Sequence, residues 1–205
     1  MALRNRMSPC GELLAVPDRG LVYGNRGCLH DATGRIRRAS AVLRWISCRL
    51  EFRGRRRTPL AQPGRYTELF FLDEATAFAA GHRPCAECRR ADYVRFGELW
   101  RAVHPGDRSA DAIDRTLHAQ RWAGGRPRRY TGSYGDLPDA SFVLLDEQPW
   151  LARGGELLRW TPGGYTDHQP GPRGNAVVLT PPSLRAVIDA GWSSDLPLLH
   201  PSAKR

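Results

Sequence analysis

The cysteine pair at Cys85 and Cys88 constrains this 205-residue chain more than any other sequence feature. It lies in the segment 73–90, DEATAFAAGHRPCAECRR, on a tight turn with a predicted helix on either side. Two thiolates separated by two residues can chelate one tetrahedral Zn²⁺ at Zn–S distances of about 2.3 Å when two further ligands arrive from elsewhere in the chain. The pair therefore predicts half of a zinc site.

Capping signals predict the turn itself. Asp73 is expected to cap a short alanine-rich helix that ends at Ala80, and Gly81 suits the left-handed position that follows a helix. Pro84 prevents the helix from continuing. The chain must therefore change direction just before the two cysteines.

Two further helices are expected after the turn. The first begins near Glu87, because apolar residues recur at spacings of three and four from Tyr93 to Val103. Its first turn would contain Cys88, so the positive end of the helix dipole would help to keep the thiolates ionised. The second runs from Ser109, a good N-cap, to Trp122.

The same segment resembles a known family. The run from Glu74 to Gly81, followed by Arg83-Pro84-Cys85-x-x-Cys88-Arg89, is similar to the second half of the zinc-binding domain of the Ada DNA-repair protein and its stand-alone relatives. The resemblance does not extend to the family's upstream pair of cysteines. It implies a four-cysteine zinc module with affinity for DNA. No segment resembles the alkyltransferase active-site signature, so methyl transfer by that domain is not implied.

Five cysteines are available for four ligand positions. One lies in a glycine-bounded turn, GNRGCLHD, and another lies in VLRWISCRLEF, which is typical of a strand. The predicted ligand set is Cys28, Cys48, Cys85 and Cys88, and the predicted cofactor is Zn²⁺.

An alternative remains for one of these ligands. Cys48 could instead pack as a small apolar side chain, since alternate residues of its strand share one face. His30, two residues after Cys28, would then be the natural replacement as the fourth ligand. Cys10 is interpreted as a spare.

The cysteine usage also indicates the compartment. A thioredoxin-like motif would follow a buried strand, whereas this pair follows a helix and a Gly-His-Arg-Pro turn. The cysteines are sparse, and the segment 1–20 is charged and contains two prolines, unlike a signal peptide. No run approaches the roughly 20 apolar residues needed to cross a bilayer. We expect no membrane partner and a reducing cytoplasmic location.

The positive charge is concentrated at one end of the chain. Residues 1–60 contain 13 arginines and four acidic residues, and so account for +9 of the net charge of +10. Arginines alternating with aromatic residues favour phosphate contacts and ring stacking, so nucleic acid, DNA more than RNA, is the predicted partner. A solvated arginine-rich surface is the alternative, because the chain contains a single lysine. The predicted nucleic-acid-binding residues are Arg35, Arg37, Arg38, Arg53, Arg55, Arg56 and Arg57.

One more basic run, GGRPRRY at 124–130, is interpreted as an ordinary surface loop, although its core resembles a minor-groove AT-hook.

An enzymatic function is the alternative to a binding function. His30 with Asp31 and flanking arginines could serve a metal-dependent nuclease or another nucleic-acid-processing enzyme, in which the histidine is the base for water. These residues supply the required chemical types without a recognisable catalytic spacing.

The predicted fold is α+β. Residues 1–125 are expected to form a basic zinc-knuckle region, treble-clef-like and with helices, that has a possible role in DNA repair or regulation. Residues 126–205 are expected to form a small β-rich sheet or half-barrel, because short apolar runs alternate there with turn clusters. The boundary is soft, and one two-layer domain is the alternative.

Overall fold

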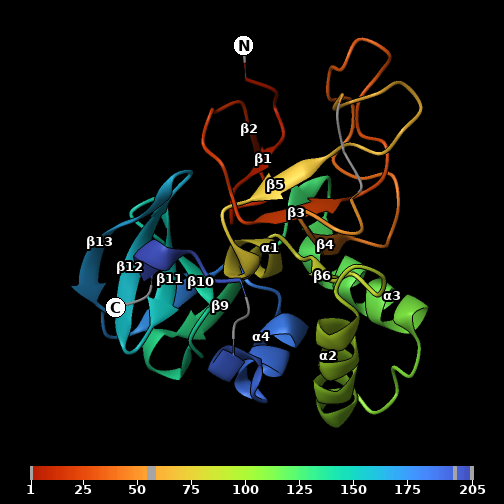
Figure 1. The fold of residues 1–205 in the computed structure, drawn as a ribbon. Helices are drawn as coiled ribbons and strands as arrows, with labels where there is room; N and C mark the ends of the chain where they lie inside the picture. Colours follow the sequence, from red (N-terminus) through yellow and green to blue (C-terminus); the bar gives the residue numbers. More distant parts are fainter. Residues whose placement is uncertain (1, 55–58, 196–197, 204–205) are drawn as a thin grey trace.

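Two six-stranded sheets lie on either side of a short central helix, α1 (Glu74–Ala79), as Figure 1 shows. The structure is a computed structural model that describes residues 2–54, 59–195 and 198–203. The molecule has mixed α+β character, as predicted. Among the described residues, none of the helices is long and apolar enough to span a membrane.

The first sheet is built mainly from the N-terminal third of the chain. Its strand order is β2-β1-β5-β3-β4-β6, in which β1 pairs with β5 and β4 pairs with β6 in parallel and the other pairs are antiparallel. The strands are β1 (Arg6–Met7), β2 (Leu13–Leu14), β3 (Val22–Asn25), β4 (Ile46–Arg49), β5 (Leu69–Phe71) and β6 (Arg83–Pro84).

The second sheet is an antiparallel sheet from the C-terminal part of the chain, with the order β13-β12-β11-β10-β14-β9. The sequence predicts a sheet in this region, but the strand β13 lies in a segment whose composition favours a turn cluster. That segment becomes a strand because its backbone pairs with β12. The strands are β9 (Tyr130–Ser133), β10 (Phe142–Leu145), β11 (Gln148–Arg153), β12 (Glu156–Thr161), β13 (Gly164–Pro170) and β14 (Asn175–Val178).

The remaining elements are a small hairpin, helices and short 3₁₀ turns. A small hairpin, β7 (Trp122–Ala123) with β8 (Arg126–Pro127), follows the third helix. The helices are α2 (Arg90–Val103), α3 (Ala110–Arg121) and α4 (Pro182–Asp189), with short 3₁₀ turns at η1 (Tyr134–Asp136), η2 (Trp192–Asp195) and η3 (Pro201–Ala203). The Ser109 hydroxyl caps α3 by accepting from Ala112 N at 3.1 Å, which confirms the predicted start of that helix.

Helix α1 is capped as the sequence predicts and joins the two halves of the molecule. The Asp73 carboxylate accepts from the backbone N of Thr76 at 2.9 Å, and Gly81 has the expected positive φ of 81°. The same carboxylate accepts from the Tyr165 hydroxyl at 2.9 Å and from His200 N at 3.2 Å. All six residues of α1 are buried, so the helix forms part of the core.

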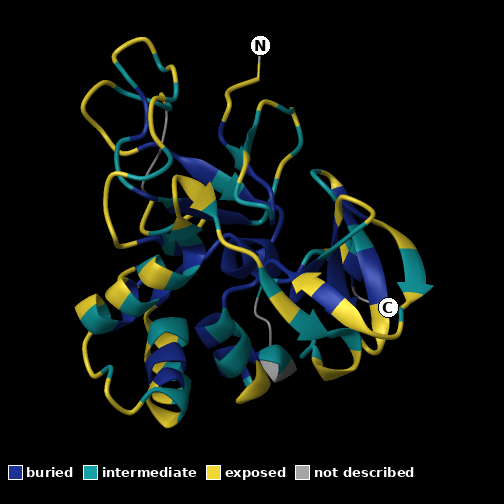
Figure 2. Cartoon of the chain, turned by 180° about the vertical axis from the view of Figure 1, so that it is seen from behind, coloured by how far each residue is buried: buried dark blue, intermediate teal, exposed yellow. Residues whose placement is uncertain are grey.

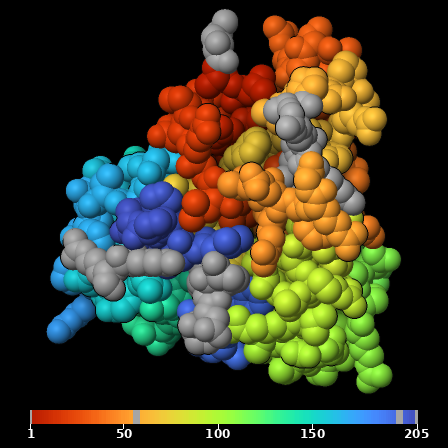
Figure 3. All heavy atoms as spheres, viewed as in Figure 1, coloured from red at the N-terminus to blue at the C-terminus, as the bar shows by residue number. Residues whose placement is uncertain are grey.

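The largest hydrophobic cluster contains residues from both sides of position 125. Buried segments, in dark blue, gather at the centre of the molecule between the two sheets (Figure 2). Phe78 of α1 packs against Phe96 and against Trp192, whose ring centroid is 5.6 Å away. In the space-filling view, the N-terminal segments in red and orange lie above the C-terminal sheet in cyan and the helical segments in yellow-green (Figure 3).

Helix α2 begins later than predicted. It starts at Arg90 and not near Glu87, so Cys88 precedes the helix and the expected dipole contact with its first turn is wrong. The reason is a separate turn, in which Arg89 N donates to Cys85 O at 3.1 Å. The two cysteines therefore lie on a turn between β6 and α2.

Candidate metal centre and arginine-lined pocket

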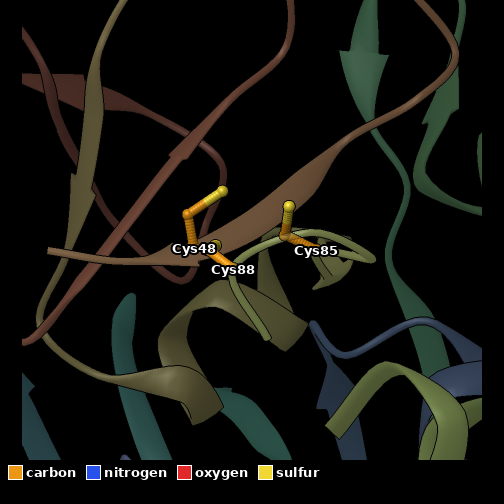
Figure 4. Close-up of side chains that lie close together, drawn as sticks. All are labelled: Cys48, Cys85 and Cys88. Atoms are coloured by element: carbon orange, nitrogen blue, oxygen red, sulfur yellow. The ribbon is translucent and has the colours of Figure 1, made fainter. Parts of the chain in front are cut away.

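Cys48, Cys85 and Cys88 form one buried cluster, with their sulfur atoms all within 4.8 Å of one another. Figure 4 shows the three side chains together, the first on strand β4 and the other two on the turn after β6. Strand pairing creates this arrangement: β4 and β6 are parallel neighbours, and Cys85 N donates to Ser47 O at 2.9 Å. Sulfur atoms around a tetrahedral zinc lie about 3.8 Å apart, so small adjustments suffice to hold a metal.

Hydrogen bonds link the three thiols. Hydrogen bonds from Cys48 and Cys88 lower the pKa of Cys85. Hydrogen bonds to Cys85 and Cys88 raise the pKa of Cys48. A metal ion would replace the shared protons, because thiolates are the metal-binding form. The three buried cysteines can therefore hold a metal ion, and within the described ranges no fourth Cys, His, Asp or Glu ligand joins this cluster.

The structure does not bring Cys28 to the other three cysteines. Its Sγ lies 3.5 Å from the backbone oxygen of His30, in a loop that folds back on itself through a bridge between His30 and Ile36. The predicted four-cysteine set therefore reduces to three among the described residues. Local hydrogen bonds close the loop that contains Cys28, and the cysteine therefore lies apart from the cluster.

His30 and Asp31 have structural partners of their own. The two ring nitrogens of His30 lie 2.6 Å from Thr67 Oγ1 and 3.1 Å from Gln62 O. Asp31 accepts from the Thr33 hydroxyl and from Arg37 Nε, and these bonds lower the pKa of its carboxyl group. Both residues thus stabilise the loop between β3 and β4, and neither is grouped with the cysteines.

Arginines converge on two adjoining hollows away from the cysteines. The first, here called the inner pocket, is the smaller and more enclosed of the two and is lined by Arg26, Arg121, Arg128 and Arg129. The second, the outer groove, is wider and more open and is lined by Arg4, Arg26, Arg37 and Arg38. They share Arg26 and Gly11, and no Asp or Glu from the described ranges lines either one. The combined surface is strongly positive.

Two of these arginines are buried against a tryptophan in the inner pocket. Trp45 is 1% exposed, and the guanidinium carbons of Arg26 and Arg121 lie 3.6 Å and 4.1 Å from its ring centroid. Arg26 donates to Ala80 O at 3.0 Å, and Arg121 donates to Gly81 O at 2.7 Å and to Leu43 O. Cation–π contacts and carbonyl acceptors hold both groups in place without neutralising their charge.

His82 supports this arrangement from behind. Its Nε2 accepts from Arg26 Nε at 3.3 Å, and its ring packs edge-on against Phe71 at 4.6 Å between centroids. Burial, followed by the charges of Arg26 and Arg121, lowers the pKa of His82 well below its ordinary value. A neutral His82 is therefore the acceptor that orients Arg26.

The cysteine cluster and the inner pocket belong to the same pair of strands. Trp45 lies three residues before Cys48, and His82 lies three residues before Cys85. Between them, β4 pairs with β6, and Arg83 N donates to Trp45 O at 3.2 Å. A metal at the cysteines would fasten the same strand pair that positions the pocket residues.

The predicted nucleic-acid-binding residues fall in different places. Arg37 and Arg38 line the outer groove, whereas Arg35 and Arg53 are exposed and line neither hollow. The run Arg55, Arg56 and Arg57 lies outside the described residues.

Sequence reasoning missed the arginines of the inner pocket. Arg128 and Arg129 come from the basic run 124–130, whose sequence favours an ordinary surface loop, so the signal for these two arginines is the basic run itself. Arg26 and Arg121 are isolated in sequence, and only the packing of β3 and α3 around Trp45 brings them together.

Comparison of the chain with protein-family models, curated proteins and solved structures gives no significant match. The resemblance to the Ada zinc-binding domain and the treble-clef description therefore stay predictions. The function has to be inferred from the two features that the fold brings together, the three-cysteine cluster and the arginine-lined hollows.

Proposed function

We propose that this protein is a zinc-stabilised nucleic-acid-binding protein whose arginine-lined hollows receive the phosphate backbone. One observation carries the proposal: seven arginines line two adjoining hollows, no Asp or Glu of the described residues lines either one, and of the seven only Arg37 has an ion pair with a described carboxylate, that of Asp31. Guanidinium groups bind phosphate oxygens through paired, charge-assisted hydrogen bonds. Such a surface favours a polyanion with regularly spaced charges.

Zinc is the proposed metal because of the donor set. Three soft thiolates select Zn²⁺ over hard cations such as Mg²⁺ and Ca²⁺, and the predicted reducing cytoplasm would keep them free of disulfides. When bound, the ion would fasten β4 to the turn after β6. We assign it a structural role, in which it keeps Trp45 and His82 in the positions that hold Arg26.

DNA is the proposed form of nucleic acid, in line with the resemblance of the cysteine segment to the Ada zinc-binding domain. A role in DNA repair or regulation rests on that resemblance alone. The nuclease alternative finds no support, because His30 and Asp31 have structural partners and are not grouped with the cysteines.

The experiment compares two double variants that each remove two positive charges. Arg128→Gln with Arg129→Gln alters the exposed rim of the inner pocket, and Arg101→Gln with Arg108→Gln alters exposed arginines that line neither hollow. Binding of labelled DNA is followed by fluorescence anisotropy between 50 and 200 mM NaCl.

The rim variant should bind more weakly and should lower the slope of log Kd against log salt by about 1.4 to 1.8, since each lost phosphate contact contributes about 0.7 to 0.9. The control variant should keep the wild-type slope. Equal losses in both variants would show that net charge, and not the arginine-lined surface, governs binding.

A further inference from the structure

The inner pocket contains buried positive charge that the protein itself does not neutralise. Arg26 and Arg121 are 2% and 4% exposed, and no carboxylate oxygen of the described residues lies within 4.0 Å of either guanidinium group. The carboxylate that acts on Arg121 from further away, Asp114, is held by two hydrogen bonds from Arg83 at 2.9 Å and 2.7 Å. Buried charges are normally paired, so this pair lacks an anion.

The guanidinium group of Arg121 is also incompletely satisfied. Arg121 Nε is buried and has no hydrogen-bond partner within the described part of the chain. Burial lowers the pKa of Arg121 to about 9, and burial together with Arg121 lowers the pKa of Arg26. A bound anion would relieve both costs, because it would supply an acceptor and a compensating charge.

The shape of the pocket limits which anion fits. The inner pocket is the more enclosed of the two hollows and opens beside the wider outer groove. A phosphodiester within a strand is linked to a nucleotide on each side and therefore suits the open groove. An enclosed pocket can receive only the terminus of a strand. The half-buried Trp122 at the pocket wall offers an aromatic surface for the neighbouring base.

The number of charges distinguishes a terminal phosphate from an internal one. A terminal phosphomonoester has a charge of about −1.5 to −2 at pH 7, which matches two uncompensated guanidinium groups, whereas a diester has a charge of −1. We infer that the inner pocket binds the terminal phosphate of a single DNA strand, while the outer groove binds the adjoining backbone. This inference rests on the proposed nucleic-acid-binding function.

The pocket is suited to binding and not to covalent chemistry. Its one cysteine, Cys10, lines the wall, and burial raises the pKa of that thiol to about 11. At neutral pH the thiol is protonated and is a poor nucleophile. The pocket is therefore assigned the binding of a strand end, without a reaction at that end.

The test uses three labelled single-stranded 12-mers of one sequence, ending in a 5′-phosphate, in a 3′-phosphate or in hydroxyl groups only. Anisotropy titrations use the metal-loaded wild type and Arg121→Gln. One of the phosphorylated strands should bind at least about tenfold more tightly than the hydroxyl strand, the effect of charge-assisted hydrogen bonds to two arginines. The preference should disappear in Arg121→Gln.

Because Arg121→Gln could disturb folding, a second measurement uses the wild type alone. At equal ionic strength, inorganic phosphate should displace the phosphorylated strand more effectively than chloride does. For the hydroxyl strand, phosphate and chloride should be equally effective. A nucleoside monophosphate serves as a further competitor, and it should bind more weakly than the phosphorylated strand.

The outcomes are distinguishable. Equal, salt-sensitive binding of all three strands would overturn the strand-end inference and leave the nucleic-acid-binding function intact. A mononucleotide that binds as tightly as the strand would replace a strand end with a free nucleotide as the ligand. Failure of every strand to bind would refute the proposed function itself.

Discussion

Replacing Cys48 by serine is the most informative single perturbation of this protein. The side chain is the one member of the cysteine cluster that lies on β4, while the other two share a turn. Cys48→Ser therefore removes the metal-mediated link between the two segments. It leaves Cys85 and Cys88 in place as an incomplete pair.

The expected size of the effect follows from the length of chain that the metal closes into a loop. Positions 48 and 85 are 37 residues apart. Cross-linking a loop of that length lowers the entropy of the unfolded chain by an amount equivalent to about 4 kcal/mol at 25 °C. For a chain of this size each kcal/mol corresponds to about 2 to 4 °C, so Cys48→Ser should lower Tm by about 8 to 16 °C.

The assay combines elemental analysis with thermal unfolding of the same samples. Wild type should contain one zinc per chain, and Cys48→Ser should contain much less than one. Cys28→Ser and Cys10→Ser are the matched controls, because both cysteines lie outside the cluster and should keep the metal and nearly the wild-type Tm. If Cys48→Ser retained a full equivalent of zinc with unchanged Tm, the assignment of this cluster as a structural metal centre would be refuted.

Two further predictions concern buried groups around the same core. The pKa of His82 is lower in the folded protein than in the unfolded chain, so the unfolded chain binds a proton on this residue more readily. The free energy of unfolding should therefore fall by about 1.4 kcal/mol for each pH unit below about 6.5. The variant His82→Gln, which keeps an acceptor for Arg26, should show a smaller fall when urea unfolding at pH 5.5 is compared with urea unfolding at pH 7.5. An identical pH dependence in both proteins would contradict the neutral, buried His82. Asp73→Ala should cost about 3 to 5 kcal/mol in urea unfolding, because Thr76 N and the Tyr165 hydroxyl lose a buried acceptor, and a loss below about 1 kcal/mol would show that the cap is dispensable.

Local signals in the sequence correctly predicted much of the secondary structure. As expected, α1 begins after Asp73 and ends before Gly81, and α3 begins after Ser109. These boundaries are predictable because a helix cap depends on hydrogen bonds and dihedral angles within a few residues. Strand β13 escaped prediction because its polar, turn-rich sequence becomes a strand only by pairing with β12.

The candidate site was predictable to the extent that it depends on short spacings. The spacing of Cys85 and Cys88 predicts that both are candidate metal ligands, and the strand pattern around Cys48 allows that residue to join them. Cys28 was a comparable choice by sequence, and it fails to join the cluster because its loop is closed on itself by His30 and its neighbours.

The sequence by itself determined the helix caps, the cysteine pair and an excess of arginine near the N-terminus, because these depend on neighbouring residues or on composition. The tertiary structure alone decided which cysteine completes the cluster and which arginines share a pocket. Arg26 and Arg121 are 95 positions apart and meet only across Trp45, where strand pairing and burial place them. Long-range packing of this kind leaves no periodic or local trace in a single sequence, and it is this packing that creates the uncompensated charge from which the ligand is inferred.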